Sequence, residues 1–263
     1  MDPQTPLDPQ PPDLMSRTPG VLPPPPGQNA AASHAGSPPP LHPMAASWRK
    51  PWSPAVDVLG RVTVGLLAAT IVAHLANVWF DLRGLTMLER GDVDGLVALA
   101  ARADLMPALL VASYVATAIV FVSWLGFVWR SDRSDPGQQR LRGGLAVGGW
   151  FIPVANLVLG GKALTQLWHG VDAARARDLS TPRGLLGTPP LIMLWWIGWL
   201  LMALANVINR DADRRLDAAS GADEVLGAVE TSLTVDAWTS GITAGTGAVL
   251  IVVVLGVMAM ARR

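Results

Sequence analysis

The sequence predicts an all-α membrane protein, in which a bundle of four transmembrane helices follows a proline-rich tail. The chain has 263 residues and a mean hydropathy of +0.36, and 15% of its residues are charged. In an average soluble domain about 25% are charged. The apolar residues gather in long windows without charges, and a helix needs about 20 such residues to cross a bilayer. These observations place most of the chain in a membrane.

The composition also excludes several classes of function. The chain has no cysteine, which rules out disulfides, thiolate nucleophiles and cysteine-ligated metals. Its 20 basic and 20 acidic residues give a net charge of zero, whereas a nucleic-acid-binding protein carries a basic patch. No metal-ligand spacing and no GxSxG, HExxH or phosphate-loop motif is present. We expect no cofactor, no metal, no nucleic acid partner and no catalytic residue.

Residues 1–54 are predicted to be a disordered, proline-rich cytoplasmic tail, ahead of a transmembrane domain over residues 55–263. Sixteen of the 22 prolines lie in this tail, and few large apolar residues interrupt them. Such a stretch buries too little surface to offset the entropy lost on ordering. Two interpretations stay open: the tail is a ligand for a polyproline-binding partner, or it is solvated and has no dedicated partner.

Four charge-free windows are candidates for membrane spans. They are 19 to 26 residues long and almost wholly apolar, whereas a typical helix of a soluble protein has about 11–12 residues. The predicted spans lie near residues 56–80, 107–129, 190–209 and 239–261.

A fifth apolar window differs from these four in its helix-breaking residues. Gly143–Gly161 holds six glycines together with Pro153 and Asn156. Proline lacks a backbone donor and crowds the preceding turn. The sequence therefore predicts a broken segment over 145–160, which either crosses the membrane or dips into it and returns.

The residues after this break predict a surface helix. Leu164, Leu167, Trp168 and Val171 recur at the spacing of one helical face, and polar residues fall mostly on other faces. An apolar stripe of this kind between two membrane segments is typical of an interfacial helix. We expect this helix over residues 162–178, on the cytoplasmic surface.

The distribution of basic residues predicts the orientation. Counted from residue 49, four spans with both termini in the cytoplasm place thirteen Lys and Arg residues inside and six outside, in agreement with the positive-inside rule. If 145–160 crosses as a further span, the counts become ten and eight, and Lys162 is left inside a span. The four-span arrangement is therefore favoured.

The excess of Arg over Lys suits a bacterial genome of high GC content, so the expected location is the bacterial inner membrane.

The first predicted span carries a polar stripe in its outer half. His74, Asn77 and Asp81 lie three and four residues apart, on one helical face. Polar groups inside a span mark a ligand or proton site, or they form hydrogen bonds to neighbouring helices. Both interpretations stay open.

Other spans offer candidate partners for this stripe. Asn206 and Asn209 lie at the outer end of the third span, the same side on which the stripe ends. Ser113 and Ser123 are candidates for a Ser–His pair with His74, which an intramembrane hydrolase would need. No pattern in the sequence supports that pair further.

A motif of aromatic and helix-breaking residues lies within the broken segment. It reads Trp150-Phe151-Ile152-Pro153-Val154-Ala155-Asn156-Leu157, and it is followed by Trp168 and by the pair Trp195-Trp196. By these residues the chain resembles the bacterial family catalogued as domain of unknown function 4328, over about residues 60–260. The resemblance implies a small integral membrane protein and carries over no activity. Trp150, Phe151, Pro153, Asn156 and Trp168 are the candidate motif, with a structural or a binding role.

We expect the motif to form the turn at which the chain leaves the membrane. Pro153 would stop a continuous helix, and the Asn156 side chain would pair with a backbone group freed by the break. Trp150 would lie in the membrane interface with its indole N–H paired. The alternative is a kinked helix that spans the membrane.

The predicted function is that of a non-catalytic, multi-pass membrane protein that associates with other membrane components. Its partners would be the lipid bilayer, other membrane proteins or further copies of the chain. One alternative is a small channel or transporter that uses the broken segment. A second alternative is an intramembrane enzyme.

Overall fold

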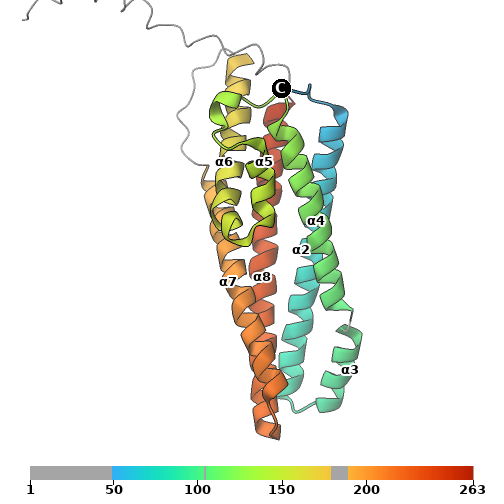
Figure 1. Ribbon diagram of the computed structural model, residues 1–263. Helices are drawn as coiled ribbons and strands as arrows, with labels where there is room; N and C mark the ends of the chain where they lie inside the picture. Colours follow the sequence, from blue (N-terminus) through green and yellow to red (C-terminus); the bar gives the residue numbers. More distant parts are fainter. Residues whose placement is uncertain (1–48, 104, 179–188, 263) are drawn as a thin grey trace, which may run out of the picture. The chain divides into compact units, whose positions relative to one another are not determined.

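The computed structural model describes residues 49–103, 105–178 and 189–262, and these form helices joined by turns (Figure 1). The predicted tail lies almost wholly outside the described residues. The helices belong to one compact unit, Trp48–Arg263. The helices in chain order are α2 (Pro54–Glu89), α3 (Val93–Ala103), α4 (Met106–Trp129), α5 (Gly143–Gly148), α6 (Pro153–Asp178), α7 (Pro190–Ala218) and α8 (Ala222–Ala261). Two 3₁₀ turns, η2 (Pro136–Gln138) and η3 (Gly149–Phe151), complete the elements, and the described residues form no β-strand.

Proline and glycine mark the ends of several helices. Helices α2, α4 and α7 each carry a proline in their first two positions, where the missing N–H would have no partner inside the helix anyway. After α2 the chain turns at Gly91, whose φ of 67° lies in the left-handed region that glycine adopts without a Cβ clash.

The chain is a membrane protein by the length and composition of its helices. Four helical segments are long and apolar enough to cross a bilayer, namely Pro54–Glu89, Val93–Trp129, Pro190–Ala218 and Ala222–Ala261. Between 17% and 39% of the most apolar window of each is buried inside the bundle. Large apolar side chains such as Val72, Val111 and Val207 are more than 60% exposed. Such an apolar exterior suits lipid and not water.

The four long helices are arranged as an open arc. Helix α2 packs against both α4 and α8, and α7 packs against α8. Between α4 and α7 the described residues make no extensive contact. The order around the bundle is therefore α4, α2, α8 and α7, with a gap between the first and the last.

Helices α5 and α6, joined by η3 and an extended residue, Ile152 (φ −102°, ψ 111°), fill part of this gap. Figure 1 shows both limbs beside α4, α7 and α8, at the end of the bundle where the chain terminates. We call residues 143–178 the α5–α6 hairpin. Helix α6 begins at Pro153, so the second half of the segment predicted as broken is helical.

The apolar face of α6 differs from the sequence prediction in what it contacts. Leu164, Leu167 and Val171 are at most 1% exposed and belong to the same core as residues of α4 and α8. The predicted surface helix over 162–178 is therefore the second limb of the hairpin, and its apolar stripe packs against protein. Helical periodicity identifies such a stripe but does not show whether protein or lipid covers it.

Hydrogen bonds connect the hairpin to the loop that precedes it. The backbone N–H of Asp135 donates to the carbonyl of Gly170 at 2.8 Å, and that of Leu141 donates to Gln166 Oε1 at 2.9 Å. At the same end of the bundle, Arg262 forms an ion pair with Asp57 at 2.8 Å. These contacts fix the hairpin to the preceding loop and the end of α8 to the start of α2.

Candidate functional site

A polar cluster joins three of the long helices. It consists of His74, Asn77 and Asp81 of α2, Asn209 of α7, and Asp236 and Ser240 of α8. Asn77 lies at its centre: its Nδ2 atom is 2.9 Å from Asp81 Oδ2, 2.9 Å from Asp236 Oδ2 and 3.2 Å from Ser240 Oγ. Asn77 and Asp81 are each 6% exposed. The amide therefore shares its two protons among acceptors on two helices.

The outer members of the cluster extend it to α7 and to His74. Asn209 Nδ2 donates to Asp236 Oδ1 at 3.2 Å, and His74 Nδ1 lies 3.2 Å from Ser240 Oγ. Asn206, the other candidate of the third span, donates to the carbonyl of Met202 in its own helix. The stripe and Asn209 thus lie together, and Asp236 connects them.

The serine beside His74 is not one of those considered from the sequence. Ser113 and Ser123 donate to carbonyl groups of α4, at 2.9 and 2.7 Å, and Ser240 is the residue next to the His74 ring. Ser240 is 2% exposed, and neither His74 nor Ser240 lines the cavity described below.

The cluster offers no metal site in the described part of the chain. There, no group of three or more His, Asp and Glu side chains is arranged to hold an ion. The hydrogen bonds of the cluster connect α2, α7 and α8. Of the two interpretations of the stripe, they correspond to hydrogen bonding between neighbouring helices. Sequence reasoning missed Asp236 because this residue lies three positions before the fourth predicted span. Its spacing of four residues from Ser240, on one helical face, was the available signal.

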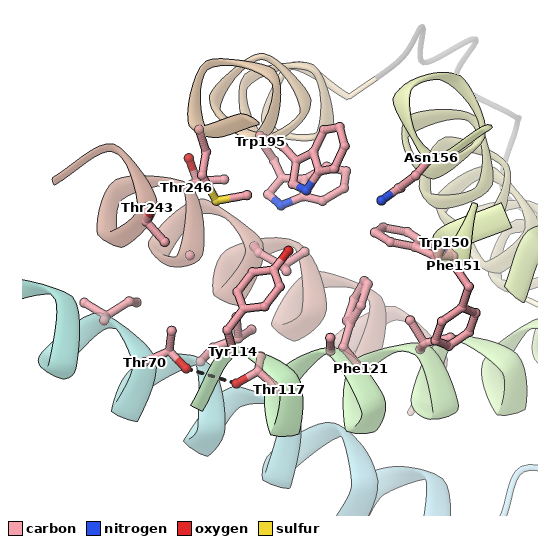
Figure 2. Close-up of a pocket in the computed structure, with 18 residues that line it drawn as sticks. Thr70, Tyr114, Thr117, Phe121, Trp150, Phe151, Asn156, Trp195, Thr243 and Thr246 are labelled. Carbon is pink, nitrogen blue, oxygen red and sulfur yellow. Dashed lines mark hydrogen bonds between the residues drawn. The ribbon is translucent and has the colours of Figure 1, made fainter. Parts of the chain in front are cut away.

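A second feature is a cavity of about 220 Å³ at the tip of the hairpin (Figure 2). It is bounded by α2, α4, α7 and α8, and the hairpin contributes Trp150, Phe151 and Asn156 from the motif. Six aromatic side chains line it: Tyr114, Phe121, Trp150, Phe151, Trp195 and Trp199. The cavity thus brings the motif together with aromatic residues of both helices that flank the gap.

Trp150 stands between two other rings of the wall. Its ring centroid is 5.3 Å from that of Phe121, at an interplanar angle of 79°, and 5.9 Å from that of Trp195, at 41°. Edge-to-face and tilted pairs at such distances are favourable arrangements of aromatic rings. These contacts hold the tip of the hairpin against α4 and α7.

Most polar groups of the cavity wall already have partners. The hydroxyls of Thr70, Thr243 and Thr246 donate to carbonyl groups of their own helices at 2.8 to 2.9 Å. Thr117 Oγ1 lies 3.0 Å from Thr70 Oγ1, as Figure 2 shows. The threonine hydroxyls therefore offer few free hydrogen-bond donors to a molecule in the cavity.

Two donors from the motif are the exception. Trp150 Nε1 is buried and has no hydrogen-bond partner among the described residues. No hydrogen bond of the Asn156 side chain is found there either, and Figure 2 shows its amide nitrogen directed toward Trp150 and Trp195. The expected pairing of Asn156 with a freed backbone group and the expected paired indole of Trp150 are therefore not observed. Both residues line the cavity.

Trp168 holds the hairpin at a different place. A Cβ atom added to Gly256 of α8 would lie 2.8 Å from Trp168 Cη2 and 2.9 Å from Cζ3. In the same way, a Cβ at Gly161 would lie 2.7 Å from Trp196 Cδ1. Two indole rings thus use the space that glycine leaves, and this fixes how closely α6 approaches α7 and α8.

Comparison with known proteins adds a family but no activity. The family model described as Domain of unknown function (DUF4328) matches residues 87–259, a range that includes the motif, Trp168 and the helices on both sides of the gap. Comparisons with curated proteins and with solved structures gave no match.

Proposed function

The chain belongs to the family described as Domain of unknown function (DUF4328), and we propose that it is a non-catalytic membrane protein that binds another membrane component. The proposed binding place is the gap between α4 and α7. The observation that carries the proposal is the open arc, since every other pair of neighbours in it packs closely. Only side chains meet across the gap: Tyr114 of α4 is hydrogen-bonded to Trp199 of α7, and the cavity lies beside this contact.

Exposure of the wall residues supports an opening at this gap. Tyr114 of α4 and Phe151 of the hairpin line the cavity and are 46% and 70% exposed. We call the exposed edge of the cavity at Tyr114 and Phe151 the side opening. Because it lies between helices of spanning length, a molecule that enters it arrives from the hydrocarbon phase of the membrane and not from water.

Crosslinking from the side opening tests the proposed function. A photoreactive phenylalanine analogue at Phe151 should yield a discrete adduct in cell membranes, either a lipid or a protein, and a crosslinked dimer would identify a second copy. The matched control carries the analogue at Trp79, which is 59% exposed on α2 and does not line the cavity. The same diffuse adducts from both positions would refute the proposal.

The finer membrane arrangement is also part of the proposal. Both termini lie in the cytoplasm of a bacterial cell, and the hairpin enters the inner membrane from that side and returns to it. The positive-inside counts support this orientation. In Figure 1 the start of α2, the chain terminus and both ends of the hairpin lie at one end of the bundle. The proline-rich tail would then be a disordered cytoplasmic segment, available to a polyproline-binding partner.

Thiol labelling tests this orientation, since the chain has no cysteine of its own. Asp92→Cys, Gln138→Cys and Ala222→Cys introduce single thiols at exposed positions. A membrane-impermeant reagent should label positions 92 and 222 in intact cells, and position 138 only after permeabilisation. Labelling of position 138 alone in intact cells would reverse the orientation.

The two alternative functions have less support from the described residues. A channel or transporter needs a polar path, but the cavity wall is aromatic and aliphatic and its hydroxyls are engaged with their own helices. An intramembrane enzyme needs a substrate space beside its reactive pair, and neither His74 nor Ser240 lines the cavity. Binding of a lipophilic molecule needs neither a polar path nor a reactive pair.

A further inference from the structure

We propose that the cavity binds the planar, carbonyl-bearing ring of an uncharged lipophilic molecule of the quinone class, whose apolar tail leaves through the side opening. This inference rests on the proposed function and names the class of the bound component. Four properties of the cavity support it: its size, its aromatic wall, its two unused donors and its opening toward lipid.

The size of the cavity fits a ring. An apolar cavity of about 150 Å³ in a protein core binds benzene. The volume here is about 220 Å³, which accommodates a six-membered ring with carbonyl and methyl substituents. A whole lipid does not fit, so the remainder of the molecule has to lie outside, in the gap between α4 and α7.

The wall favours a planar group over an acyl chain. The chain has only four Phe, one Tyr and eleven Trp residues, and six aromatic side chains gather around this one cavity. Aromatic faces and edges contact a flat ring by stacking and edge-to-face geometry, the arrangement already present between Trp150 and Phe121. An acyl chain gains nothing from such geometry beyond burial.

The polar groups of the cavity wall favour a ligand that has an uncharged hydrogen-bond acceptor. Trp150 Nε1 is a donor only, and the Asn156 amide nitrogen also donates. A buried N–H without a partner is costly, and a carbonyl oxygen on the ligand would satisfy it. No charged side chain lines the cavity within the described residues, so a carboxylate or an ammonium group would be buried without a counter-ion.

Titration of the purified full chain with two probes tests the inference. The probes are a short-tailed benzoquinone and a short-tailed naphthoquinone, measured by calorimetry in lipid nanodiscs. Saturable binding of at least one is expected. Trp150→Phe keeps an aromatic ring but removes the donor, and it should weaken binding about 2- to 12-fold, the effect of one neutral hydrogen bond. Asn156→Leu, of similar shape, should weaken binding by a similar factor.

Two further variants separate a site in the cavity from other effects. Ala118→Phe places a ring inside the cavity and should lower affinity more than tenfold. Trp124→Phe is the matched control, because Trp124 Nε1 is also buried without a partner but does not line the cavity. Its affinity should equal that of the unmodified chain. Circular dichroism and gel filtration of each variant confirm that it is folded.

Three results would overturn the inference. They are no saturable binding of either quinone, unchanged affinity of folded Ala118→Phe, and a copurified phospholipid that neither quinone displaces. In each case a discrete adduct from Phe151 would leave the proposed function standing, so the failures of the two proposals are distinguishable.

Discussion

Replacing Asn77 by leucine should destabilise the bundle more than any other single change in the polar cluster. Leucine has nearly the shape of asparagine, so the substitution removes hydrogen bonds without opening a large cavity. It takes away the donor that lies 2.9 Å from both Asp81 Oδ2 and Asp236 Oδ2. The two carboxyl groups, on α2 and α8, would then face each other with no donor between them.

The magnitude follows from the number and kind of the lost hydrogen bonds. A hydrogen bond between neutral groups contributes about 0.5–1.5 kcal/mol and one to a charged group about 1.5–3 kcal/mol, and Asn77 makes two to carboxyl groups. Hydrogen bonds between membrane helices average only about 0.6 kcal/mol in double-mutant cycles, and Asn209 still donates to Asp236 in the variant. We therefore expect the free energy of unfolding to fall by about 2–4 kcal/mol.

Reversible unfolding by SDS in mixed micelles, followed by circular dichroism, measures this change. Asn206→Leu is the matched control, because Asn206 is exposed and its amide bonds within its own helix, and it should change stability by less than about 0.5 kcal/mol. A double-mutant cycle of Asn77→Leu with Asp236→Asn should give a coupling of at least about 1 kcal/mol. A loss below 1 kcal/mol together with a coupling near zero would refute the assignment of Asn77 as the centre of the cluster.

Glycine substitutions give further predictions, each measured by the same unfolding assay. Gly256→Ala should cost about 1–3 kcal/mol, because the new Cβ overlaps the Trp168 ring; an unchanged stability would show that the ring shifts freely. Gly245→Ala, where a Cβ meets nothing within 4 Å, should instead stabilise α8 by up to about 1 kcal/mol. Gly91→Ala should cost about 1–2 kcal/mol, because its φ of 67° is unfavourable for residues with a Cβ. Gly65→Ala, in a helix and open space, serves as its control, and equal effects of the two would contradict the argument from φ.

The membrane character of the fold could be predicted from the sequence, because hydropathy and the absence of charge are local properties. The helices extend beyond the predicted spans, since α2 continues to Glu89 and α8 begins at Ala222. A charge-free window ends at the first ionisable residue, whereas a helix continues as long as its backbone and its neighbours allow. Asp236 was missed as part of the site for this reason.

The candidate site was predictable only in its parts. Asn156 within an apolar segment and the adjacent aromatic residues Trp150 and Phe151 were visible signals of a special segment. Their role as a cavity wall depends on Phe121 and Trp195, which come from helices far away in the sequence. The pairing of Asp57 with Arg262, 205 residues apart, is equally invisible to local spacing. Such contacts follow from the order of helices around the arc, which hydropathy does not specify.

Helix α8 connects the three features of the bundle in sequence and in space. It carries Asp236 and Ser240 in the polar cluster, Thr243 and Thr246 in the cavity wall, and Gly256 beneath Trp168. With a rise of 1.5 Å per residue, Asp236 and Gly256 are about 30 Å apart along the helix, close to the thickness of the hydrocarbon core. The cavity therefore lies between two points at which α8 is fixed, one by hydrogen bonds to α2 and α7 and one by the close contact with the hairpin. Because α2 in turn holds α4, these two fixed points maintain the gap between α4 and α7 that the ligand would enter.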